Sequence, residues 1–90
     1  LNSVQRWGDG MIISRIQRTS TGQYTLYHSQ GHTDYIVIVQ TTPWAVDGDR
    51  WTIGIECGRY NDHFNIQTLD ANKGLMNIDF RVVVIGRPAD

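Results

Sequence analysis

The stretch that decides the fold reads Tyr35-Ile36-Val37-Ile38-Val39, the longest unbroken apolar run in the chain. A second run reads Val82-Val83-Val84-Ile85. Both are rich in β-branched residues, which favour strands because their side chains pack well on a pleated surface. Neither run alternates with polar residues, so both strands are predicted to be apolar on both faces. A run of five residues is too short to cross a bilayer, and no membrane insertion is expected.

The composition of the whole chain also favours β-strands. Val, Ile and Thr supply 25 of the 90 residues, whereas Ala, Leu, Glu, Lys and Met together supply 11, and this ratio favours strands over helices. A chain of this length forms one small domain. Six strands separated by short turn clusters are expected over residues 11–18, 23–28, 35–41, 51–57, 64–69 and 77–87.

The predicted fold class is therefore all-β: a small antiparallel β-sandwich of six to seven strands over residues 11–90. The mostly polar residues 1–10 are expected to be a connector or the end of a shaft. Because the chain begins at Leu1, without an initiator methionine, we expect it to be a fragment or processed tail of a longer polypeptide.

Turn and strand chemistry predict further local details. Gly22 and Gly74 are expected to take positive φ, the latter in a hairpin connection over residues 70–74 that joins the last two strands. The strand over 51–57 alternates, which places Trp51, Ile53, Ile55 and Cys57 inward and Thr52, Gly54 and Glu56 outward. Cys57, the single cysteine, is then a small buried hydrophobe, and no internal disulfide is possible.

The two strands with apolar side chains on both faces need more cover than a small sandwich supplies. Each sheet of a sandwich buries only one face, and exposed clusters of Val and Ile invite aggregation. We therefore predict an obligate oligomer with these strands at its interface. The alternative is that Trp7, Trp44 or the N-terminal arm folds over the second face.

Charge and motif content argue against several functions. The chain has 8 Lys and Arg against 9 Asp and Glu, for a net charge of −1, and its arginines are dispersed, so no nucleic-acid partner is expected. Glu56 is the only glutamate, which gives little support for a pair of catalytic carboxyl groups. There is no Gly-x-Ser-x-Gly elbow and no glycine-rich phosphate loop. The chain is not predicted to be an enzyme, and no cofactor is expected.

Three residues that can bind metal, His28, His32 and Asp34, lie within seven residues around a predicted turn. Imidazole and carboxylate groups suit zinc or a similar ion. Their spacing matches no established motif, so solvated turn residues are the preferred interpretation and no metal is predicted. A site on an oligomer axis, with one histidine from each chain, stays open.

Ligand recognition has better support, because two loops combine aromatic rings with planar polar groups. The ligand-binding candidates in the first loop are Trp44, Asp47, Asp49 and Arg50, and those in the second are Arg59, Tyr60, Asn61, Asp62 and His63. Such groups suit a sugar, since a ring covers the C–H face and charged groups bind hydroxyls. The loops flank opposite ends of the strand over 51–57, so two neighbouring copies would be needed to bring them together. The alternatives are core packing for Trp44 and an ordinary solvated loop for residues 59–63.

Four patterned segments carry a resemblance to a known family. They read Gly22-x-Tyr24-x-Leu26-x-His28, Tyr35-Ile36-Val37-Ile38-Val39, Phe64-x-Ile66-x-Thr68 and Ile78-x-Phe80-x-Val82-x-Val84-x-Gly86. Over residues 22–87 this order resembles the C-terminal tips of bacteriophage tail fibres, and it is also similar to the small H-type lectin sandwich. The resemblance implies a six-stranded antiparallel sandwich, a homotrimer, a place in the virion and attachment to host-surface glycans. No position here matches the sugar-binding residues of the lectin family.

Two functional hypotheses follow. In the first, the chain is a non-enzymatic, trimeric receptor-binding tip domain of a tail fibre, and its partner is a cell-surface polysaccharide or other glycan. In the second, it is a structural domain that trimerises or caps a fibre and binds no ligand.

Overall fold

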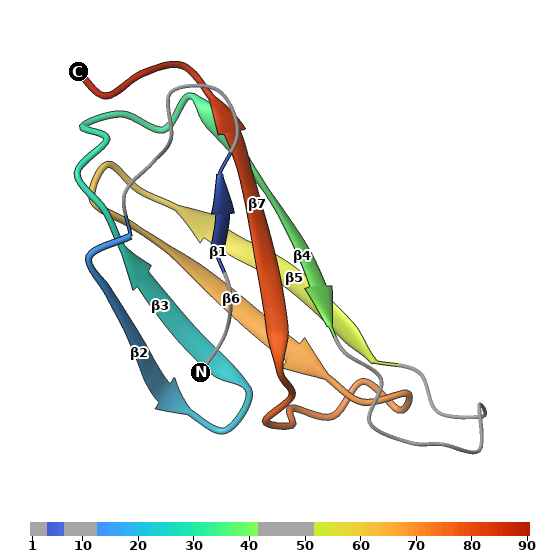
Figure 1. The fold of residues 1–90 in the computed structure, drawn as a ribbon. Helices are drawn as coiled ribbons and strands as arrows, with labels where there is room; N and C mark the ends of the chain where they lie inside the picture. The colour runs from blue at the N-terminus through green and yellow to red at the C-terminus, as the bar shows by residue number, and fades with distance from the viewer. Residues whose placement is uncertain (1–3, 7–12, 42–51) are drawn as a thin grey trace.

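The computed structural model describes residues 4–6, 13–41 and 52–90 of the chain. This described part contains strands and turns but no helix, and so no helix that could cross a membrane. Its strands are β1 (Val4–Arg6), β2 (Arg15–Ser20), β3 (Gln23–Tyr27), β4 (Tyr35–Thr41), β5 (Ile53–Arg59), β6 (His63–Leu69) and β7 (Phe80–Gly86) (Figure 1).

The strands form two sheets. One has the order β1-β7-β4 and the other the order β2-β3-β6-β5 (Figure 1). All pairings are antiparallel except that of β1, which runs parallel to β7 inside the range expected to be a connector. The all-β prediction is confirmed, with six antiparallel strands in two sheets, and the trimer stays a prediction.

The core lies between the two sheets, because strand alternation sends every second side chain inward. The four-stranded sheet contributes Tyr24, Leu26, Phe64 and Ile66, and the other sheet contributes Tyr35, Phe80, Val82 and Val84. The rings of Tyr24 and Phe80 meet edge to face, with centroids 4.8 Å apart. Burial of each large apolar side chain is worth about 1.5–3 kcal/mol, so this shared core is what holds the sheets together.

The connection between the last two strands differs from the predicted hairpin. β6 and β7 lie in different sheets, because the apolar sides of both strands pack into the same core from opposite directions. The turn over 70–74 is closed by Asp70, whose Oδ1 accepts hydrogen bonds from the backbone N–H groups of Asn72 and Gly74. The positive φ belongs to Lys73, at 65°, and not to Gly74, so that expectation is wrong.

Gly22 does take the positive φ expected of it, at 68°. A Cβ there would also lie 2.7 Å from the carbonyl oxygen of Thr68, so the turn from β2 to β3 has no room for a side chain. The Gly22 N–H donates to Asn77 Oδ1 at 2.8 Å, which ties this turn to the segment leading into β7. The turn therefore depends on glycine for both its conformation and its contacts.

The facing predicted for residues 54–57 is wrong, and Trp51, also predicted to point inward, lies outside the described residues. Ile55 is 41% exposed and Cys57 is exposed, whereas Gly54 faces β4, where a Cβ would lie 2.5 Å from Val39 Cγ1. The missing side chain at Gly54 lets the edge strands of the two sheets approach closely. A register shift between Glu56 and Gly58 then leaves Cys57 in a bulge, which alternation alone does not reveal.

Over residues 36–38 and 83–85 the outward side of β4 and β7 is apolar, as the uninterrupted runs predict. Ile36 and Ile38 are each 51% exposed and Ile85 is 43% exposed. Ile36 pairs with Ile85, and Ile38 pairs with Val83, so the four side chains form one continuous patch. We call these residues the apolar outer face. Of the alternative cover, Trp7 and Trp44 lie outside the described residues, and the described part of the N-terminal arm, β1, pairs with β7 at the edge of this sheet.

Candidate functional site

The predicted ligand-binding residues fall into two groups. Trp44, Asp47, Asp49 and Arg50 lie outside the described residues. Arg59, Tyr60, Asn61, Asp62 and His63 are described, and they form the turn between β5 and β6 together with the adjoining ends of both strands.

The backbone of this turn is held by the segment that leads from β3 to β4. The carbonyl oxygen of Asp62 accepts a hydrogen bond from the His28 N–H at 2.8 Å, and that of Asn61 accepts one from the Gly31 N–H at 2.9 Å. The buried Tyr35 hydroxyl donates to the carbonyl of Tyr60 at 2.8 Å and lies 3.2 Å from that of His63. Successive carbonyls are thus fixed, and the turn presents its side chains from a rigid backbone.

His28 completes this buried network. Its Nδ1 accepts the Gln30 N–H at 3.1 Å, so we assign the proton to Nε2, which lies 3.0 Å from the Tyr35 hydroxyl. Burial lowers the pKa of His28, against the opposing effects of the His63 carbonyl and the Asp62 carboxylate. Burial also raises the pKa of Tyr35 to about 12. Both rings therefore stay neutral at pH 7.

His32 is buried by a similar arrangement. Its Nδ1 accepts the Asp34 N–H at 3.0 Å, and its Nε2 lies 2.7 Å from the carbonyl of Pro88. The interpretation of His28 and His32 as solvated turn residues is wrong, since they are 4% and 6% exposed. Within the described part of the chain no three His, Cys, Asp or Glu side chains group as metal ligands.

The Arg59 side chain is held by contacts within the protein. Its guanidinium pairs with Glu56, Nε to Oε1 at 2.9 Å, and donates through Nη1 to the carbonyl of Tyr35 on β4. It therefore links β5 to β4 across the edge of the two sheets. Two other candidates of this turn are more exposed: Tyr60 is 48% exposed, and the Asp62 side chain is 76% exposed.

Flat side chains form a row on the outer face of the four-stranded sheet, beginning at this turn. The rings of Tyr60 and His63 stack at 4.4 Å, and the ring of Tyr27 lies 5.9 Å from that of His63. The Arg15 guanidinium lies over Tyr27, 4.2 Å from the ring centroid. We call Arg15, Tyr27, His63 and Tyr60 the aromatic row. Arg15 and Tyr27 were not among the predicted site residues, because their place beside His63 depends on the pairing of β2, β3 and β6.

Two rows of uncharged polar side chains follow the aromatic row along the same face. The first amide row is Gln17, Thr25 and Asn65, and the second amide row is Gln23 and Gln67. Thr25 Oγ1 donates to Asn65 Oδ1 at 2.9 Å, so neighbouring strands are also joined through their side chains.

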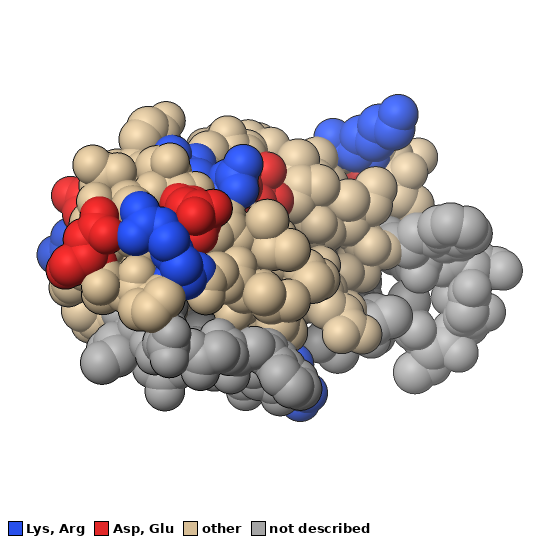
Figure 2. All heavy atoms as spheres, turned by 90° about the horizontal axis from the view of Figure 1, so that it is seen from above, with Lys and Arg blue, Asp and Glu red and all other residues tan. Residues whose placement is uncertain are grey.

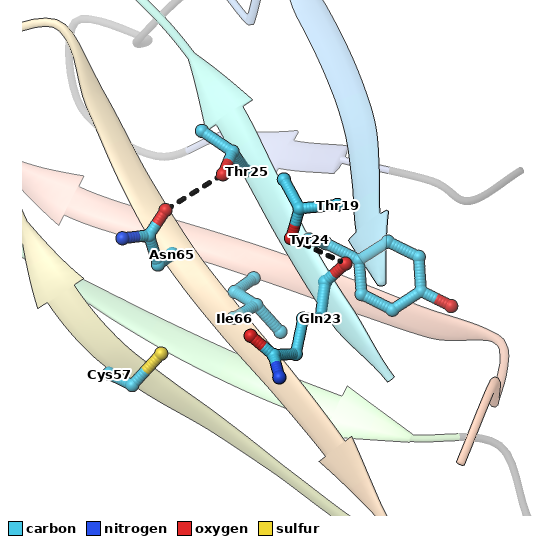
Figure 3. A pocket seen from close by; sticks show the side chains of 7 residues that line it. All are labelled: Thr19, Gln23, Tyr24, Thr25, Cys57, Asn65 and Ile66. Carbon is cyan, nitrogen blue, oxygen red and sulfur yellow. Dashed lines mark hydrogen bonds between the residues drawn. The ribbon is translucent and has the colours of Figure 1, made fainter. Parts of the chain in front are cut away.

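A hollow of about 170 Å³ opens beside these rows (Figure 3). Its lining residues are Thr19, Gln23, Tyr24, Thr25, Cys57, Asn65 and Ile66. Desolvation raises the pKa of the Cys57 thiol, so the thiolate form is disfavoured at neutral pH. The polar groups of the hollow suit hydrogen bonding to a ligand better than covalent chemistry.

The charges at the end of the molecule that carries this turn are mixed in sign. Figure 2 shows Lys and Arg beside Asp and Glu on that side, with no broad area of one sign. Arg87 pairs with Asp34 and Asp90, and His63 Nδ1 lies 2.6 Å from Asp62 Oδ1. The hydrogen bond from His63 lowers the pKa of Asp62, which stays ionised. Such a surface does not favour a polyanion such as a nucleic acid.

No family model, curated protein or solved structure matches the chain.

Removing the Tyr35 hydroxyl should weaken the fold. Tyr35→Phe leaves the buried His28 Nε2–H and the Tyr60 carbonyl without this partner, and we expect a loss of about 1–3 kcal/mol in the free energy of unfolding. Urea denaturation measures the change. Tyr60→Phe removes the same atom from a half-exposed ring and should stay within about 0.5 kcal/mol of the parent chain. Equal losses in the two variants would contradict the assigned role.

Acid should destabilise the protein through His28. Its folded-state pKa lies below the ordinary histidine value of 6.5, so below pH 6.5 the unfolded chain binds more protons and stability falls as the pH falls. One such group contributes a slope of at most about 1.4 kcal/mol per pH unit. Urea denaturation between about pH 7.5 and about pH 5 should show a shallower slope for His28→Asn, which keeps an acceptor for the Gln30 N–H. An unchanged slope would show that another group controls the dependence.

Proposed function

We propose that this chain is a receptor-binding tip domain of a phage or phage-like tail fibre, which attaches as a non-enzymatic homotrimer to host cell-surface glycans. It would act outside the cell as part of the virion. The proposal draws on the resemblance of residues 22–87 to tail-fibre tips and on the unlike outer faces of the two sheets.

The contrast between the outer faces carries the proposal. The apolar outer face presents Ile36, Ile38, Val83 and Ile85 from the sheet β1-β7-β4. The opposite outer face, on the four-stranded sheet, presents the aromatic row and the two amide rows. A continuous apolar patch favours contact with other protein, whereas exposed rings beside amides and hydroxyls favour a hydroxylated ligand.

The apolar outer face supports self-association. Its four side chains lie at opposite positions of the neighbouring strands β4 and β7 and form one patch. A second copy of the chain could therefore bury all four at once. In a trimer with these faces inward, the three four-stranded sheets would point away from the axis. Each would then remain open to a receptor.

The aromatic row supports sugar binding. The exposed ring of Tyr60 offers an apolar surface to the C–H face of a sugar, while the Asp62 carboxylate accepts hydrogen bonds from hydroxyls. Because the turn backbone is fixed by the segment after β3, little conformational entropy is lost when a ligand binds.

The alternative function is a structural one, in which the domain trimerises or caps a fibre and binds no ligand. The apolar outer face favours this alternative as much as it favours the receptor-binding proposal. The polar face of the four-stranded sheet would then be only a solvated surface.

Glycan binding should depend on the ring of Tyr60. On an array of bacterial surface polysaccharides, we expect Tyr60→Ala to weaken binding by about tenfold or more, because stacked ring area is lost, whereas Tyr60→Phe keeps most of the affinity. Light scattering should show the same oligomer for all three proteins. Absence of binding by the parent chain, together with normal adsorption by phage that lack the domain, would favour the structural alternative.

A charge on the apolar outer face should break the oligomer. We expect Ile38→Lys to convert a trimer into monomers, because the lysine would be buried without a partner at the interface. Size-exclusion chromatography with light scattering measures the mass, and circular dichroism checks the fold. Gln17→Lys, on the outward face of the other sheet, is the matched control and should stay trimeric. A parent chain that is monomeric at high concentration would overturn the trimer.

A further inference from the structure

We infer that the ligand is an extended, uncharged polysaccharide chain that lies along β3 and β6 and is contacted at three successive sugar units. The inference rests on the proposed glycan-binding function and specifies its ligand class. It assigns the outer face of the four-stranded sheet as the binding surface, in addition to the turn between β5 and β6.

The spacing of the rows supports a chain rather than a single sugar. His63, Asn65 and Gln67 are successive outward residues of β6, and each pairs with an outward residue of β3. Outward residues of one strand are about 6.6 Å apart, so the rows form a ladder about 13 Å long. Their polar groups are spread along a line and are not gathered around one point. An extended polymer would meet all three rows, whereas one sugar ring would meet one.

The chemistry of the rows supports an uncharged ligand. Amide side chains donate and accept hydrogen bonds, as sugar hydroxyls do. The outward positions in the two amide rows hold only Gln, Asn and Thr, and those beside them on β2 and β5 include Ser20, Ile55 and Gly58. Exposed surfaces usually intersperse Lys, Arg, Asp and Glu. A stretch without them offers no partner to carboxylate or sulfate groups. The aromatic row does hold one cation, Arg15, but the Asp62 carboxylate beside His63 has the opposite sign, so this end of the sheet does not select an anionic chain either.

The two kinds of row have different tasks. The aromatic row takes the C–H face of one sugar unit at the end of the sheet that is held by Tyr35 and His28. The amide rows extend the contact to the following units, beside the hollow that Gln23 and Asn65 help to line (Figure 3). Affinity should therefore rise with chain length until all three rows are filled.

The test measures binding of oligosaccharides of graded length. An array of neutral and anionic bacterial surface polysaccharides first identifies a binder, and its mono-, di- and hexasaccharides are then titrated by calorimetry. We expect the hexasaccharide to bind at least about tenfold more tightly than the disaccharide. Gln67→Ala should weaken the hexasaccharide by about fivefold and leave the disaccharide unchanged, because only the longer chain reaches the second amide row. Tyr60→Ala should weaken both.

Gln40→Ala is the matched control, since it removes an exposed amide from the outward side of β4 and should change neither affinity. Equal affinities for the mono- and hexasaccharide, or an unaltered hexasaccharide affinity in Gln67→Ala, would overturn the extended-chain inference while leaving glycan binding intact. Binding confined to anionic polysaccharides would overturn the uncharged class. Failure to bind any polysaccharide would overturn the proposed function as well.

Discussion

The hydroxyl group of Tyr35 is the constraint on which the candidate site depends. It lies in the core between the sheets, receives the Nε2–H of His28 and donates to the backbone of the turn between β5 and β6. A polar group in this position is stable only if it is hydrogen bonded. The buried Tyr35 hydroxyl therefore fixes the backbone of the turn directly. The exposed ring of Tyr60 belongs to this fixed turn.

The two outer faces follow from one shared core. Packing the sheets together buries the inward side chains of both. Each sheet keeps an outward side that no described residue of the other sheet covers. On β4 and β7 most of that side is apolar, whereas on β3 and β6 it is polar and aromatic. This asymmetry places an apolar surface and a polar, aromatic surface on opposite sides of one domain of 90 residues.

Strand type and most strand positions could be predicted because apolar alternation and β-branched runs are local signals. β4 occupies the predicted range 35–41, and the two-faced character of β4 and β7 is confirmed. The facing of β5 could not be predicted, because Gly54 takes the inward position for close contact with Val39 and so turns Ile55 outward, and the bulge at Cys57 then interrupts the alternation. The burial of His28 and His32 was missed because segments distant in sequence lie against them, the Asp62 backbone beside His28 and the Pro88 carbonyl beside His32. The aromatic row could not be predicted either, because its members come from separate strands that only the pairing of β2, β3 and β6 brings together.

The bulge in β5 has a practical consequence. The chain's single thiol, Cys57, lies in it, at the surface and on the margin of the hollow that Asn65 helps to line. A fluorophore attached there would be the sole label on each molecule and would sit next to the amide rows. The protein thus carries its own attachment point for a spectroscopic reporter, and mildly alkaline buffer would favour the coupling because the thiol gives up its proton reluctantly.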